Sequence, residues 1–100
     1  MAGQVRREPR EPVTCVIKAR GAGLRETKAK LEDITRLGCR LEMFSAVNVH
    51  DEIWVRLPNL EPLRAVVCWA DKFQVGVEFN TPIHPAVFEH LLQSMKGSEG

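Results

Sequence analysis

The chain has few of the side chains that enzymes and metal proteins use for chemistry. It contains 3 histidines and 3 cysteines, and none of them form an H-x-x-x-H or C-x-x-C pair. This spacing favours neither a zinc site nor a disulfide framework. We expect Cys15, Cys39 and Cys68 to be reduced, small core residues. No Ser-His-Asp or Cys-His set has a useful spacing, so the sequence predicts a protein that is not an enzyme and that binds no metal.

Tyrosine is absent, and an excess of either charge is absent as well. The chain has four phenylalanines, two tryptophans, and 14 Lys+Arg against 13 Asp+Glu, for a formal net charge of +1. A binder of single-stranded nucleic acid needs exposed aromatic residues among basic ones, and a general nucleic-acid binder needs a strongly basic face. Both classes are therefore poor interpretations of this sequence.

Long apolar runs are also missing. No stretch approaches the roughly 20 apolar residues that span a bilayer. The start, Met-Ala-Gly-Gln, lacks the apolar centre of a secretory signal. We therefore expect a cytoplasmic protein with no membrane association.

What the chain does have is a strong alternation of apolar and polar residues. With 100 residues, 44% hydrophobic and 27% charged, it fits one domain with a real core. The period of two predicts six short antiparallel strands and thus an all-β barrel. The side chains expected to face inward are Val13, Cys15, Ile17 and Ala19; Ala29 and Leu31; Cys39, Leu41 and Met43; Ile53, Val55 and Leu57; Leu63, Ala65, Val67 and Trp69; and Phe73, Val75, Val77 and Phe79.

Near the end of the chain the period changes to that of a helix. His84 is a plausible cap, Pro85 suits a first helical turn, and the apolar residues then recur at helical spacing up to Met95. We expect this helix to pack on the barrel. The predicted organisation is a flexible arm over residues 1–12, a barrel with its closing helix over 13–96, and a disordered tail over 97–100.

Two short clusters carry the chemistry. Arg6, Arg7 and Arg10 form an R-x-x-x-R motif with one additional arginine, and residues 33–38 form D-x-[S/T]-x-x-G. Arginine can stack on a purine, pair with guanine O6 and N7, or bind a phosphate, and aspartate can accept from the N1 and N2 edge of guanine. Taken alone, each cluster has an ordinary interpretation as a solvated arm or as a structural turn.

The two clusters in this order, ahead of a β-rich body, resemble the PilZ domain family, receptors for the bacterial messenger cyclic di-GMP. The resemblance runs from about Arg6 to Leu92. It includes the V-x-W segment at residues 67–69 and the G-V-x-F strand at residues 76–79. Thr35 stands where serine is commoner in the family, and it keeps the hydroxyl.

The resemblance implies a ligand site and a signalling role. Arg6 and Arg10, assisted by Arg7, would hold guanine faces and phosphates, while Asp33 would accept the guanine N1 and N2 protons. Thr35 would reach a base or a phosphate, and Gly38 would permit the turn. Trp69 is either core, which its size favours, or a minor ligand contact.

The implied ligand is cyclic di-GMP, held singly or as a stacked pair, with no further cofactor. Ligand binding would move the arm over the barrel and signal to an unknown protein partner in motility or biofilm control. The alternative is a PilZ-like protein-interaction module, in motility, pilus or envelope functions, that does not bind nucleotide.

Overall fold

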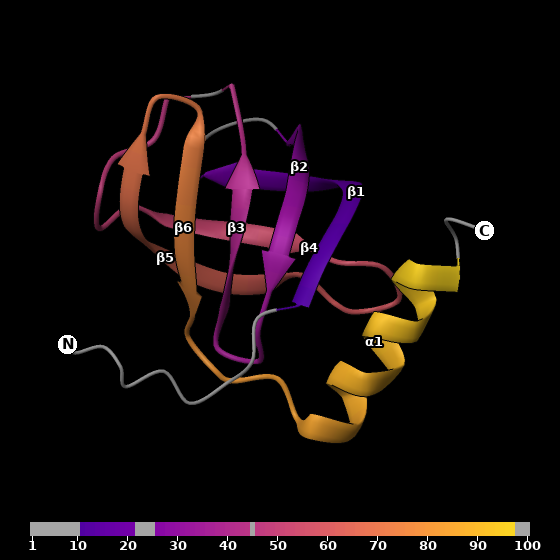
Figure 1. Cartoon of the computed structure of the whole chain (residues 1–100). Coiled ribbons are helices and arrows are strands. Elements are labelled where there is room, and N and C mark those ends of the chain that lie inside the picture. The colour runs from indigo at the N-terminus through magenta and orange to yellow at the C-terminus, as the bar shows by residue number, and fades with distance from the viewer. Residues whose placement is uncertain (1–10, 22–25, 45, 98–100) are drawn as a thin grey trace, which may run out of the picture.

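The computed structural model describes residues 11–21, 26–44 and 46–97. These residues form six strands and one helix: β1 (Glu11–Gly21), β2 (Thr27–Ile34), β3 (Gly38–Glu42), β4 (Glu52–Arg56), β5 (Leu63–Asp71), β6 (Gln74–Phe79) and α1 (Pro85–Gly97). The strands close into an antiparallel barrel in the order β1-β2-β3-β6-β5-β4 (Figure 1). This confirms the predicted fold class, a six-stranded antiparallel barrel with a C-terminal helix.

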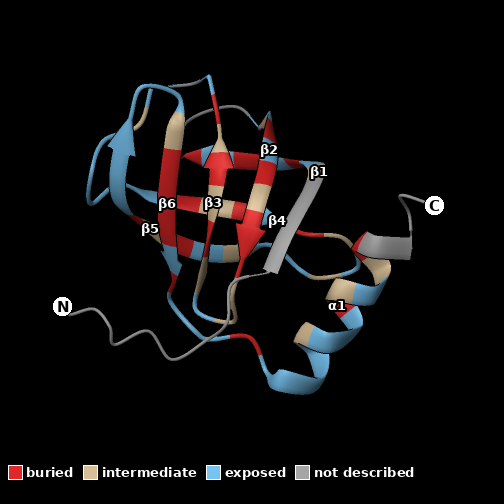
Figure 2. Ribbon diagram, viewed as in Figure 1, coloured by how far each residue is buried: buried red, intermediate tan, exposed pale blue. Residues whose placement is uncertain are grey.

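The core fills the barrel interior with the predicted alternate side chains. The core includes side chains with 0% of their surface exposed: Leu31, Leu41, Ile53, Val55 and Val67. Their outward neighbours along each strand are exposed or half-buried, which gives the banded ribbons of Figure 2. Burial of a large apolar side chain stabilises the fold by roughly 1.5–3 kcal/mol, so this inward set supplies most of the stability of the barrel.

The barrel is irregular at three places, where one strand carries an extra residue against its partner. The register shifts lie between Pro12 and Cys15 in β1, between Leu31 and Asp33 in β2, and between Val67 and Trp69 in β5. A β-bulge of this kind bends the strand and changes which face the following side chains occupy. Side chains after each bulge therefore depart from the simple alternation of the sequence.

The prediction of a core position is wrong for Cys68 and for Phe73. Cys68 lies in the β5 bulge and is exposed, and Cys15 is only half-buried, so Cys39 alone among the three free cysteines is a buried core residue. Phe73 precedes β6 and is 53% exposed. It packs against exposed Phe44, with the two ring centroids 4.8 Å apart.

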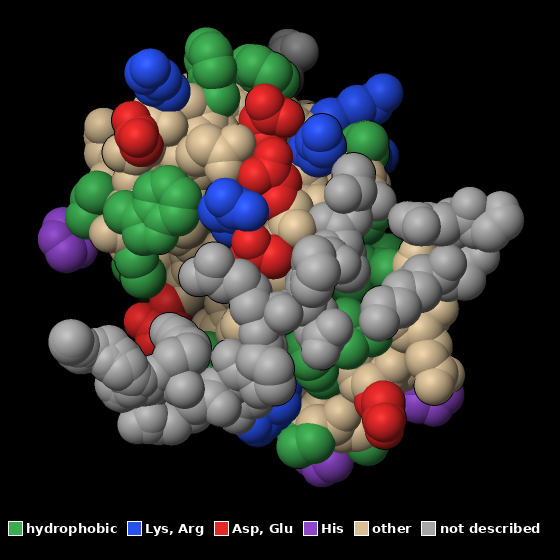
Figure 3. All heavy atoms as spheres, viewed as in Figure 1, with side chains coloured by type: hydrophobic (Ala, Val, Ile, Leu, Met, Phe, Trp, Pro, Cys, Tyr) green, Lys and Arg blue, Asp and Glu red, His purple; other side chains and the backbone are tan. Residues whose placement is uncertain are grey.

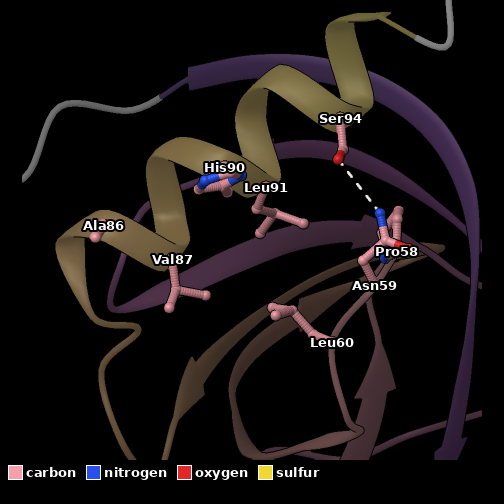
Figure 4. Close-up of a pocket in the computed structure, with 8 residues that line it drawn as sticks. All are labelled: Pro58, Asn59, Leu60, Ala86, Val87, His90, Leu91 and Ser94. Carbon is pink, nitrogen blue, oxygen red and sulfur yellow. Dashed lines mark hydrogen bonds between the residues drawn. The ribbon is translucent and has the colours of Figure 1, made fainter.

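Helix α1 begins as its sequence predicts and packs beside the barrel. The Ala86 N–H donates to His84 Nδ1 at 3.1 Å, which confirms His84 as a cap. Leu91 and Met95 are buried against the barrel. Asn59, in the loop between β4 and β5, donates to the Ser94 hydroxyl at 3.3 Å (Figure 4). Within the part of the chain that the structure describes, no helix is long and apolar enough to cross a membrane.

The expected arm and tail fall mostly on residues 1–10 and 98–100, which lie outside the described residues. Arg6, Arg7 and Arg10 are among them. Strand β1 already begins at Glu11, and α1 continues to Gly97.

Candidate functional site

The D-x-T-x-x-G segment forms the tight connection between β2 and β3. The Thr35 hydroxyl accepts from the N–H groups of Leu37 and Gly38, at 2.9 and 3.2 Å. The Thr35 N–H in turn donates to the Gly38 carbonyl at 2.8 Å. Both acceptor positions of the hydroxyl are thus used by the turn. Thr35 therefore has a structural role in the turn, whether or not a ligand is bound.

The same turn is fixed to the chain that follows β6. The Phe79 N–H donates to the Leu37 carbonyl at 2.7 Å, and the Ile83 N–H donates to the Arg36 carbonyl at 2.9 Å. The Arg36 side chain returns this bond, with Nε donating to the Ile83 carbonyl at 2.7 Å. The turn is consequently a rigid platform rather than a loose loop.

Gly38 is required by close backbone approach. A Cβ atom at this position would collide with the carbonyl oxygen of Val77 in the neighbouring strand β6. Gly38 pairs directly with Glu78 in that ladder. A backbone atom cannot move aside as a flexible side chain can, so no other residue fits without a shift of β3 or β6.

Asp33 is the buried charged residue of the site. It is 7% exposed, and its Oδ2 accepts from Arg40 Nε and Nη2 at 3.0 and 2.9 Å. The two residues are direct cross-strand partners only because of the bulge in β2; the register before the bulge would place Asp33 opposite Cys39. Arg40 also lies 3.7 Å from Glu32 and keeps 41% of its side chain exposed. Arg40 therefore fixes the orientation of the buried Asp33 carboxylate.

Trp69 is a surface residue, so its predicted core placement is wrong. The bulge at Cys68 pairs Trp69 with Gly76. The indole lies on Gly76, where an added Cβ would meet the ring, and 42% of the residue stays exposed. The exposed ring lies beside the turn, so its contact with a ligand stays a prediction.

Together these residues border a shallow hollow of about 250 Å³ on the outer face of β2, β3, β6 and β5. Its lining includes Asp33, Thr35, Gly38, Arg40, Trp69 and Glu78. Figure 3 shows acidic and basic side chains interleaved along the middle of this face. The hollow can take a flat aromatic group, with a carboxylate at one side and an indole at the other.

Two cysteines also border the hollow, and neither is an activated nucleophile. Burial, and then the nearby Asp33 charge, raises the pKa of the Cys39 thiol far above its usual range. Burial and the Glu78 charge raise the pKa of Cys68, against a backbone hydrogen bond from Glu78 that lowers it. Nucleophilic cysteines need a lowered pKa. Within the described ranges, no group of His, Cys, Asp and Glu could hold a metal ion.

The structure thus brings together Asp33, Thr35, Gly38 and Trp69 from the sequence-based set. Residues missed by sequence reasoning are Arg40, which orients Asp33, and Arg36, which anchors the turn. The sequence offered one signal for Arg40: it is a cation at an outward position of the strand that follows the Asp33 motif. Without knowledge of the bulge, that signal cannot pair it with Asp33.

Comparison with known proteins decides the family. The model of the PilZ domain matches residues 4–97. The chain belongs to the PilZ domain family. This family comprises cyclic di-GMP-binding and adaptor domains, and its members are generally receptor modules rather than enzymes. No match was found among the curated proteins.

Solved structures agree with this PilZ fold. The PilZ domain of CeSA from a cellulose-synthesizing bacterium aligns with a TM-score of 0.63 at 18% identity, over 92% of this chain and 99% of that one. The Bacillus subtilis inhibitor of motility, MotI/DgrA, aligns with a TM-score of 0.60 at 18% identity, over 96% of this chain and 52% of that one. At such identities these neighbours establish the fold alone.

Proposed function

We propose that this PilZ domain is a cyclic di-GMP receptor that passes the signal to a protein partner in the cytoplasm. The observation that carries the proposal is the register of β1 on β2. Glu11 pairs with Ile34 and Pro12 pairs with Asp33, so the start of β1 lies beside the D-x-T-x-x-G turn. Arg10 directly precedes Glu11 in the sequence. In this proposal the R-x-x-x-R motif, which ends one residue before β1, would reach the hollow from this end of the strand.

The side chains have complementary tasks in this proposal. Asp33 accepts the N1 and N2 protons of guanine, and its bond to Arg40 fixes the carboxylate for that contact. Arg6 and Arg10, with Arg7 assisting, bind guanine O6 and N7, the base faces and the phosphates. Trp69 offers an exposed ring for stacking at the far side of the hollow.

The Thr35 hydroxyl contributes its proton. Its lone pairs accept from the turn, and its own bond to the Gly38 carbonyl is long, at 3.5 Å. A phosphate or base oxygen placed above the turn would be a better acceptor. Gly38 acts indirectly, because it allows β3 and β6 to approach closely under the ligand.

Ligand size supports the need for the arginine segment. The hollow of about 250 Å³ is below the ~300–1,000 Å³ of typical small-molecule sites, so it would take only part of a dinucleotide and the rest of the ligand needs another wall. Residues 1–10 would supply that wall, for a single ligand or a stacked pair. The position of this segment over the bound ligand would then be what a partner detects.

The test is isothermal titration calorimetry with cyclic di-GMP, beside GTP and cyclic GMP. The intact chain should bind cyclic di-GMP selectively, and Arg10→Ala and Asp33→Asn should each weaken binding by about tenfold or more. Arg20→Ala is the matched control. Arg20 is exposed at the opposite end of β1, so this variant should bind cyclic di-GMP as the intact chain does. Circular dichroism of each variant separates loss of binding from loss of fold.

One observation favours the alternative, a PilZ-like interaction module without nucleotide. The Asp33 carboxylate already has a strong partner in Arg40, as a purely structural aspartate would. In that case the folded intact chain would release no heat with cyclic di-GMP. That result would overturn the receptor proposal and leave the adaptor function.

A further inference from the structure

A second surface of the barrel carries an unusual row of like charges. On the outer face of three neighbouring strands, Lys18 of β1 pairs with Lys28 of β2 on one side and with Arg56 of β4 on the other. All three side chains are exposed. Direct cross-strand partners have Cβ atoms about 4.5–5.5 Å apart, and like charges at this distance destabilise a sheet. We call Lys18, Lys28 and Arg56 the basic row.

The surroundings of the basic row reinforce its charge. Arg20 lies on the same outer face, at the next outward position of β1, and so does Lys30 of β2, whose cross-strand partner in β3 is Glu42. Glu26, 3.7 Å from Arg56, makes the single ion pair that the described residues provide for the basic row. A chain with a net charge of only +1 thus concentrates five cations on one side of its barrel. This concentration needs a compensating benefit, since it costs folding stability.

The basic row continues into a groove whose walls are partly polar and partly apolar. Lys18 and Arg56 also border a hollow of about 410 Å³ whose other walls include Val16, Pro58, Leu60 and Pro62. Val16 is 67% exposed, which is a large exposure for a valine in the middle of a strand. The loop at Pro58–Leu60 also forms one wall of a second groove, of about 390 Å³, against helix α1. Figure 4 shows Leu60, Val87 and Leu91 converging on that second groove.

From this arrangement we propose that the face formed by the basic row and the adjoining grooves is a docking site for a protein segment that carries both carboxylates and apolar side chains. The cations attract and orient the carboxylates, and the Val16 and Leu60 grooves receive the apolar groups. Charge complementarity of this kind gives specificity and a fast association rate. The site lies at the Lys28 end of β2, whereas Asp33 lies near the opposite end.

Two other anionic partners fit the surface less well. A nucleic acid would use exposed aromatic rings among the cations. Trp54, the aromatic residue beside Arg20, is half-buried and already covered by Arg64 at 5.1 Å. An anionic membrane would be attracted by the cations alone and would make no use of the adjoining grooves. The grooves therefore favour a polypeptide.

The test uses fluorescence anisotropy of the full chain, without nucleotide, and three labelled peptides. The first peptide repeats glutamate-glutamate-leucine-leucine, so that each face of an extended chain carries both residue types. The second replaces leucine by serine, and the third replaces glutamate by lysine. We expect saturable binding of the first peptide, at least about tenfold tighter than that of the other two, and weaker binding as salt increases.

Substitution maps the site. Lys18→Glu should weaken binding of the first peptide by about tenfold. It removes the central cation of the basic row, and the new carboxylate can pair with Lys28 and Arg56 in place of the peptide. This variant should melt at a higher temperature than the parent, so its loss of binding cannot come from unfolding. Lys72→Asp is the control for charge reversal: Lys72 is exposed in the turn before β6, where its φ of 59° suits aspartate, and binding should be unchanged.

Several results would overturn the proposal: no saturable binding of the first peptide, equal binding of the serine peptide, or equal losses in the two charge-reversal variants. Tighter binding of a single-stranded DNA or of phosphatidylglycerol vesicles would also overturn it. Because the peptide is titrated without cyclic di-GMP, its outcome is independent of the nucleotide proposal.

Discussion

At the scale of single residues, Arg40 determines how the site presents its buried carboxylate. It contacts Asp33 through two nitrogens at 3.0 and 2.9 Å, and the Asp33 side chain is only 9% exposed. A charged group that loses its partner in such a place pays much of its desolvation cost. The Asp33–Arg40 pair should therefore matter for stability in a way that exposed ion pairs do not.

We predict that Arg40→Ala lowers the free energy of unfolding by about 1–3 kcal/mol. Arg56→Ala is the comparison: it loses an exposed 3.7 Å pair with Glu26, worth only about 0–1 kcal/mol, and it also loses the repulsion from Lys18, so it should cost little or nothing. Urea denaturation followed by circular dichroism measures both values. Equal losses in the two variants would mean that Arg40 does not stabilise Asp33.

Cys39 should make the stability depend on alkaline pH. Burial raises the pKa of its thiol, so the folded protein keeps a proton that the unfolded chain releases above its usual pKa of about 8.5. The contribution of Cys39 is complete below that pH and is lost as pH rises further, by up to ~1.4 kcal/mol per pH unit. Urea unfolding at a series of pH values, under reducing conditions, should show a steeper alkaline loss in the parent than in Cys39→Ala. The same slope in both proteins would exclude this role.

At the scale of strands, two glycines of the site differ in what they protect. An added Cβ at Gly38 meets the Val77 carbonyl, which is backbone, whereas one at Gly76 meets the indole of Trp69, which can swing away. Gly38→Ala should thus cost about 2 kcal/mol or more, because β3 or β6 has to shift. Gly76→Ala should cost less than about 1 kcal/mol, since alanine also suits a strand better than glycine.

The position of the indole can be read directly. In a Trp54→Phe background, Trp69 is the only fluorophore of its kind, because the chain has two tryptophans. Gly76→Ala should shift its emission to longer wavelength and increase quenching by acrylamide, as the ring leaves the barrel surface. An unchanged spectrum would contradict the contact between Trp69 and Gly76.

The same strands explain how far the sequence alone could lead. Alternation predicted the strands and most inward residues, because one face of each strand must be buried and a slip of one residue would expose the whole set. Bulges break this logic. The extra residue at Cys68 turned Trp69 outward, and the extra residue at Glu32 placed Asp33 opposite Arg40. Neither position carries a glycine or proline that would have marked a bulge in advance.

The candidate site was predictable in part for a related reason. Thr35 and Gly38 act within a local turn, so their spacing along the chain is enough to suggest their positions. The contacts of Arg36 with Ile83 span 47 residues and depend on where the segment after β6 runs. Such distant contacts follow from the closed barrel, which sequence periodicity does not specify in atomic detail.

At the scale of the whole molecule, the barrel keeps the two proposed sites apart. The Asp33 hollow and the basic row lie toward opposite ends of β2, joined by buried Leu31 and Ala29. Substitutions at sites this far apart without shared partners generally have additive effects. Lys18→Glu should therefore leave cyclic di-GMP binding unchanged.

A thermal shift experiment tests this separation together with the receptor proposal. A ligand that binds only the folded state, at ~100 times its Kd, stabilises it by ~2.7 kcal/mol, and 1 kcal/mol raises the Tm of a domain this small by ~4–8 °C. Saturating cyclic di-GMP should thus raise the Tm by roughly 10–20 °C in the parent and equally in Lys18→Glu, whose own Tm starts higher. At the same ligand concentration, a tenfold weaker Arg10→Ala should keep about half of this shift, because its stabilisation falls to ~1.4 kcal/mol. A reduced shift in Lys18→Glu would instead mean that the two surfaces are coupled through β1 and β2.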